Sequence, residues 1–151
     1  MDGDHLAGIA DLFGGLTREE FDRALDELSF RRDEDIDADV DEAVRDYYLV
    51  GVESAASDDN EATEVFAPGP VAFPEPPDGA EDLPHILGNV DRRDISREEL
   101  AAAVRNRLTT DADHAEAGSD RARYLVDVTY DAEAWAPVDL ADVRAALADG
   151  D

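Results

Sequence analysis

The 151-residue sequence contains no cysteine and no lysine. Without cysteine, the chain forms no disulfide, holds no thiolate-bound metal and has no thiol nucleophile. Without lysine, it has no amine for Schiff-base catalysis. No apolar run approaches the roughly 18 residues of a transmembrane helix, and the acidic N-terminus has no signal-peptide pattern. These absences predict a cytoplasmic protein with no membrane partner.

The charge is strongly one-sided: 40 acidic residues face 13 basic ones, for a net charge of −27, and every basic residue is an arginine. High net charge with few apolar residues is typical of disorder, but this chain has clear helical periodicity. The other interpretation is a halophilic cytosol, where molar salt shortens the Debye length to about 3 Å and weakens self-repulsion. We favour the halophilic interpretation. In such a host, overall acidity says little about the choice of partner.

The first half of the chain has three helical apolar stripes followed by two short strand patterns. Thr17 and Glu20 have the spacing of a capping box, and Asp39 with Glu42 is a second cap pair. Residues 48–52 and 64–67 are rich in β-branched, aromatic and apolar side chains, as strands are. The expected helices cover about residues 4–13, 17–30 and 39–47.

This element order resembles a winged helix, the helix-turn-helix elaboration found in many regulators and protein-docking domains. The resemblance covers about residues 4–73. We therefore predict a mainly α (α+β) fold, with a winged-helix-like N-terminal half, a small β-ribbon and a helical C-terminal half. The expected segments are 1–73, a proline-rich strap or linker at 74–94, and 95–151, packed as one unit.

The second half begins with another clear helix start, Ser96 with Glu99, followed by apolar residues at helical spacing. Residues 120–130 fit either a strand, by alternation, or a helix, by 3.6-residue spacing; we favour a helix over 120–128. A last helix starts near Asp139. Three stretches together, LFGGLTREEFDRALDELSFRR, GPVAFPEPPDGAEDLPHIL and YDAEAWAPVDLADVRAAL, resemble an uncharacterised family of small acidic haloarchaeal proteins. That resemblance implies no activity.

Metal and cofactor sites are not predicted. The three histidines are too far apart to form a paired zinc motif; they are His5, His85 and His114. Aspartates alternate from Asp33 onward as in the early part of an EF-hand loop, but that loop requires glycine at its sixth position, where Ala38 stands. No glycine-rich phosphate loop or nucleophile motif is present, so we expect no cofactor and no enzyme activity.

One stretch departs from the acidic background. Residues 92–107 hold five arginines against three acids, which makes them the candidate contacts for phosphate or for a protein partner; they are Arg92, Arg93, Arg97, Arg105 and Arg107. We favour the interpretation that they form ordinary ion pairs with the surrounding acids. The expected recognition helix at 39–47 has one arginine against several acids, which is poor for reading DNA bases. We therefore expect an interaction or regulatory module with an unknown protein partner, and a DNA-associated regulator is the alternative.

Overall fold

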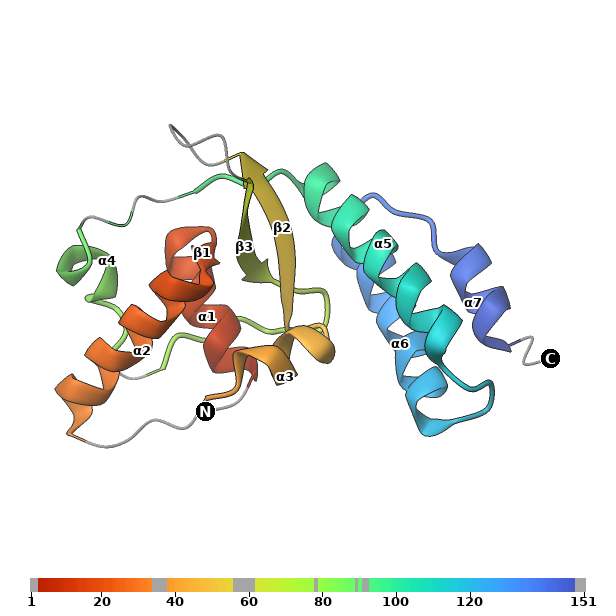
Figure 1. The fold of residues 1–151 in the computed structure, drawn as a ribbon, viewed down its shortest axis with the longest axis horizontal. Coiled ribbons are helices and arrows are strands. Elements are labelled where there is room, and N and C mark those ends of the chain that lie inside the picture. The colour runs from red at the N-terminus through yellow and green to blue at the C-terminus, as the bar shows by residue number, and fades with distance from the viewer. Residues whose placement is uncertain are drawn as a thin grey trace. The chain divides into compact units, whose positions relative to one another are not determined.

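The computed structural model describes residues 3–33, 38–55, 62–77, 79–88, 90 and 93–148. The chain divides into two compact units, Met1–Ile95 and Ser96–Asp151. Helices dominate both units, and the first also contains a small antiparallel sheet (Figure 1). The predicted mainly α fold with a small β component is confirmed.

The first unit holds four helices and three strands among its described residues. In chain order they are α1 (Gly3–Phe13), β1 (Leu16–Thr17), α2 (Arg18–Arg32), α3 (Val40–Arg45), β2 (Leu49–Ala55), β3 (Ala62–Pro68) and α4 (Leu83–Ile86). The predicted capping box at the start of α2 is present: the Glu20 amide donates to Thr17 Oγ1 at 3.2 Å, and the Thr17 amide donates to Glu20 Oε1 at 3.0 Å.

The sheet has the strand order β1-β3-β2, and both pairings are antiparallel. Its two-residue strand β1 was not predicted. In this strand Leu16 pairs with Phe66 of β3 and is fully buried. In the β2–β3 ribbon, Glu53 lies directly opposite Glu64, and both are exposed.

The core of the first unit lies between α1, α2 and the sheet. Its largest fully buried side chains include Phe13, Phe21 and Leu28. Burying a side chain of this size contributes about 1.5–3 kcal/mol, so these residues carry much of the unit's stability.

The proline-rich segment lies across α1. The Glu75 amide donates to the Asp4 carbonyl at 3.1 Å, and the Phe73 amide donates to Asp4 Oδ1 at 3.0 Å. A Cβ placed on Gly8 would lie 2.3 Å from the Glu75 carbonyl carbon, so α1 needs glycine where the segment crosses it. Further along, Ala80 is fully buried.

The second unit contains three helices among its described residues: α5 (Arg97–His114), α6 (Asp120–Trp135) and α7 (Ala141–Ala148). Residues 120–130 are helical, and α6 runs past the expected end at Val128 to Trp135. The apolar face simply continues, since Ala132 is also buried. The helix ends where Ala136 adopts an extended conformation before Pro137, because proline disfavours a helical residue before it.

Candidate functional site

Helix α3 occupies the position at which the sequence predicts a recognition helix. Its start is capped by Asp39, whose Oδ1 accepts from the Glu42 amide at 3.0 Å. Val40 and Ala43 face the core, so Asp41, Glu42 and Arg45 form the exposed side.

Ion pairing changes the charge on the exposed side of α3 only slightly. Arg18, at the start of α2, forms an ion pair with Asp41, and the hydrogen bond from that guanidinium lowers the Asp41 pKa. The Arg18 guanidinium also lies 5.5 Å from the centre of the Phe66 ring. One acid on α3 is therefore ion-paired with an arginine.

A cavity of about 380 Å³ lies beside α3. Its wall is part apolar and part acidic, formed by Gly3, Leu6, Asp39, Glu42, Ala43, Asp46 and Tyr48. With three carboxylates and no basic side chain in this lining, the hollow repels anions. Acidic side chains therefore lie on both the exposed side of α3 and its flank.

The arginines predicted as contacts have separate positions. Arg92 lies outside the described residues. Arg93 belongs to the first unit, where its guanidinium donates to both carboxylate oxygens of Glu20, at 2.6 and 3.3 Å, and to the Gly15 carbonyl at 3.1 Å. Burial raises the Glu20 pKa, but hydrogen bonds from Arg93 and Thr17 outweigh it, so the net effect is a lowered pKa.

The other three lie on α5 in the second unit. The Arg97 guanidinium is 5.1 Å from the centre of the Trp135 ring on α6. Arg107 Nε is 3.7 Å from the Asp111 carboxylate. Arg105 instead reaches α7, where its guanidinium donates to both Asp142 oxygens, at 3.2 and 2.6 Å. The structure therefore gives these arginines three different partners.

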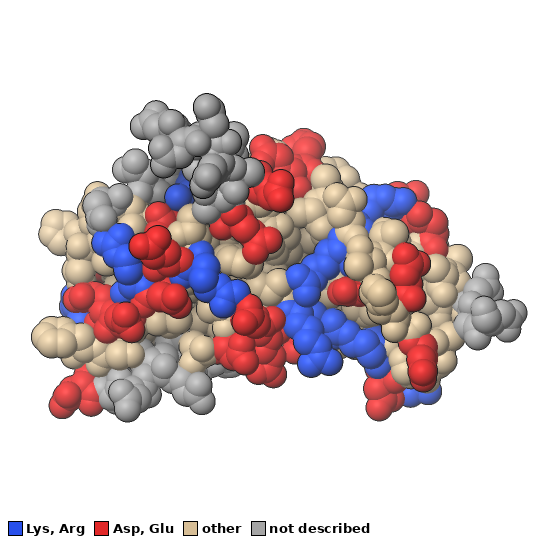
Figure 2. Space-filling view, in the orientation of Figure 1, with Lys and Arg blue, Asp and Glu red and all other residues tan. Residues whose placement is uncertain are grey.

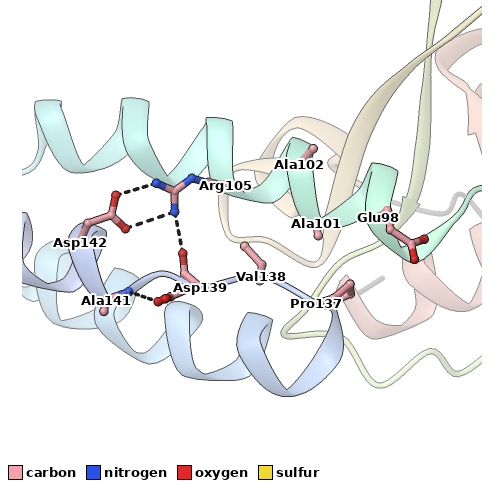
Figure 3. A pocket seen from close by; sticks show the side chains of 9 residues that line it. All are labelled: Glu98, Ala101, Ala102, Arg105, Pro137, Val138, Asp139, Ala141 and Asp142. Carbon is pink, nitrogen blue, oxygen red and sulfur yellow. Dashed lines mark hydrogen bonds and ion pairs between the residues drawn. The ribbon is translucent and has the colours of Figure 1, made fainter.

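Arg105 also closes one end of a groove between α5 and the start of α7 (Figure 3). The groove has a volume of about 700 Å³ and is lined by Glu98, Ala101, Ala102, Arg105, Pro137, Val138, Asp139, Ala141 and Asp142. The Asp139 carbonyl accepts from Arg105 at 2.6 Å, and the Asp139 carboxylate accepts from the Ala141 amide at 3.1 Å. Glu98 lies at the other end.

The groove is lined by carboxylates, one arginine and apolar side chains. Its lining contains no hydroxyl, thiol or imidazole side chain. Hydrogen bonds from Arg105 lower the Asp142 pKa, which keeps that carboxylate ionised. Among the described residues, no group of three or more His, Asp or Glu side chains could hold a metal ion, and no helix is long and apolar enough to cross a membrane.

A family model matches residues 4–151, which is nearly the whole chain. The chain belongs to DUF7109, a family of unknown function. The predicted membership of an uncharacterised family is therefore confirmed. No curated protein and no solved structure matches this DUF7109 chain.

The sequence interpretation of the DUF7109 chain missed the partners of its arginines. Eight arginines in the described part of the chain form ion pairs with carboxylates. On the face drawn in Figure 2, arginine side chains lie among acidic ones in each unit. Helical spacing could have indicated the pairs Arg107–Asp111 and Arg123–Asp120, but the pairs between distant segments carry no local signal.

Proposed function

We propose that this DUF7109 chain is a non-catalytic protein-interaction or regulatory module with a winged-helix-like first unit. The support for the winged helix is the order α1-β1-α2-α3-β2-β3 together with the sheet order β1-β3-β2. Strand β1, which was absent from the prediction, supplies the third strand that a winged helix has. In that arrangement α3 is the helix that faces a partner.

The acidic surface of α3 is the observation that carries the proposal. DNA presents one negative charge per about 1.7 Å of helix axis, and side chains that read its major groove are mostly Arg, Lys, Asn and Gln. Helix α3 presents Glu42 and the paired Asp41 beside Arg45, next to an acid-lined cavity. Such a surface favours a protein partner over DNA.

We also propose that the protein works in the cytosol of a halophile, with haloarchaea as the source. The support is compositional: 26 of the 40 acids are aspartate, and lysine is absent. The intermingled charges of Figure 2 are consistent with it, because molar salt screens the repulsion among exposed acids while partly buried pairs are screened less.

The alternative is a DNA-associated transcriptional regulator that contacts phosphate through the wing or through the arginines of residues 92–107. The loop between β2 and β3 that would form the wing tip, residues 56–61, lies outside the described residues. In favour of this alternative, the Arg105 side chain is 42% exposed in spite of its ion pair.

The proposal is tested by capture of partners on the tagged full chain in a haloarchaeal lysate at molar KCl, with and without nuclease. Glu42→Arg reverses a charge on α3, and Asp26→Arg makes the same change on the exposed side of α2 as a matched control. We expect a stoichiometric protein that survives nuclease, is lost with Glu42→Arg and is retained with Asp26→Arg. Partners that disappear on nuclease treatment would support the DNA-associated alternative instead.

A further inference from the structure

We propose that Glu20 and Arg93 form a latch that fixes the point where the chain leaves the first unit. The second unit begins at Ser96, whose hydroxyl caps α5 by accepting from the Glu99 amide at 3.1 Å. Only Asp94 and Ile95 separate that cap from Arg93. The latch therefore lies where the segment that connects the two units begins.

Arg93 is held by its backbone as well as by its side chain. Its amide donates to the Phe13 carbonyl at 2.7 Å, and its guanidinium forms the bidentate contact with Glu20. The exposed fractions of the two side chains are 26% and 18%. The planar guanidinium and carboxylate groups form a bidentate pair with two hydrogen bonds, which is stronger and more directional than a surface ion pair with a single contact.

The same carboxylate connects three parts of the first unit. Glu20 accepts from the Thr17 amide to complete the cap of α2. Thr17 is also part of β1 and pairs with Val65 of β3. The start of a helix, the edge of the sheet and the exit of the chain therefore share one group.

The latch keeps the tether to the second unit short. An extended chain spans at most about 3.6 Å per residue, so the chain from Arg93 to Ser96 covers at most roughly 10 Å. Loss of the contact with Glu20 removes one of the two anchors of Arg93 and leaves its backbone hydrogen bond to Phe13. The latch thus limits the reach of the connection, and this argument is independent of the proposed function.

Distance measurements between the units test the latch directly. Because the chain has no cysteine, Asp26→Cys on α2 and Asp131→Cys on α6 give one exposed spin label per unit. Double electron–electron resonance is recorded on the full chain in molar KCl, with and without Arg93→Ala. We expect the distance distribution to widen with Arg93→Ala, because the chain then loses one of its two anchors at Arg93.

A matched control separates the latch from a general loss of ion pairs. Arg31→Ala removes the exposed Arg31–Asp82 pair, at 3.2 Å in the same unit, and we expect it to leave the distribution unchanged. Equal widths for Arg93→Ala and the unaltered chain would overturn the proposal. So would equal widening by Arg31→Ala.

A second measurement covers the case in which Arg93→Ala fails to fold. Glu20→Gln keeps an oxygen acceptor for the Thr17 amide and removes the charge that holds the guanidinium. We expect hydrogen exchange of the Arg93 amide to accelerate by about tenfold or more, as expected for loss of a charge-assisted hydrogen bond. The Leu100 amide, which donates to the Ser96 carbonyl at 3.1 Å, serves as the internal control. Unchanged exchange at Arg93 would refute the latch.

Discussion

Replacing Gly14 with alanine should destabilise the first unit strongly. Gly14 has φ +77°, and a Cβ there would lie 1.8 Å from the Arg93 carbonyl oxygen. The left-handed conformation alone costs an alanine about 1–2 kcal/mol. The Arg93 backbone must also move, which breaks its hydrogen bond to Phe13, worth about 0.5–1.5 kcal/mol. With the strain on the neighbouring Glu20 contact, we expect Gly14→Ala to lower the free energy of unfolding by about 2–4 kcal/mol.

Gly118 provides a matched control, because it has the same φ of +77° but no atom within 4 Å of an added Cβ. Gly118→Ala should therefore cost only the backbone contribution, about 1–2 kcal/mol. Urea unfolding of both variants in molar KCl, followed by circular dichroism, measures the difference. Because m-values are about 1–3 kcal/mol/M, the Gly14→Ala midpoint should fall by about 1–2 M. A Gly14→Ala variant no less stable than Gly118→Ala would refute the reasoning.

Three further predictions concern the core, the pH dependence and the salt dependence. Leu125→Ala should lower the free energy of unfolding by about 2–5 kcal/mol, because Leu125 is fully buried. The change is measured as an earlier unfolding transition of the fluorescence of Trp135 on the same helix. Val126→Ala, at the half-buried neighbouring position, should lower the free energy clearly less, and an equal loss would contradict this prediction. Because folding lowers the Glu20 pKa, this carboxylate stabilises the fold at pH values above its pKa in the unfolded chain, about 4.3. That stabilisation is lost as the pH falls through the pKa of Glu20 in the folded protein. The stability gap between the unaltered chain and Glu20→Gln should therefore close in acid, and a pH-independent gap would count against it. Dialysis from molar to millimolar KCl should reduce the helical circular dichroism, because 40 acids then repel one another with less screening; an unchanged spectrum would remove the support for halophily.

Local signals in the sequence predicted the starts of the main helices well. Thr17, Asp39 and Ser96 each accept a hydrogen bond from the amide three residues later, as the cap spacing predicts. These signals succeed because a cap and its partner lie within one helical turn, so no knowledge of the tertiary fold is needed.

Features that depend on distant partners could not be predicted in the same way. Strand β1 consists of Leu16 and Thr17 alone, and only its pairing with Phe66 and Val65, far along the chain, identifies it as a strand. The sequence predicts nearby acids as ion-pair partners for Arg93, but its partner Glu20 lies 73 residues away. Periodicity has no information about such pairings, which only the folded backbone brings together.

The sheet order leaves β2 with one side unpaired within the described part of the chain. An edge strand of this kind is a template for association with another chain. Glu53 and Glu64 place two like charges side by side on the exposed ribbon. A strand that added along this edge would bring its own side chains close to that charge, so we expect the pair to oppose association along β2.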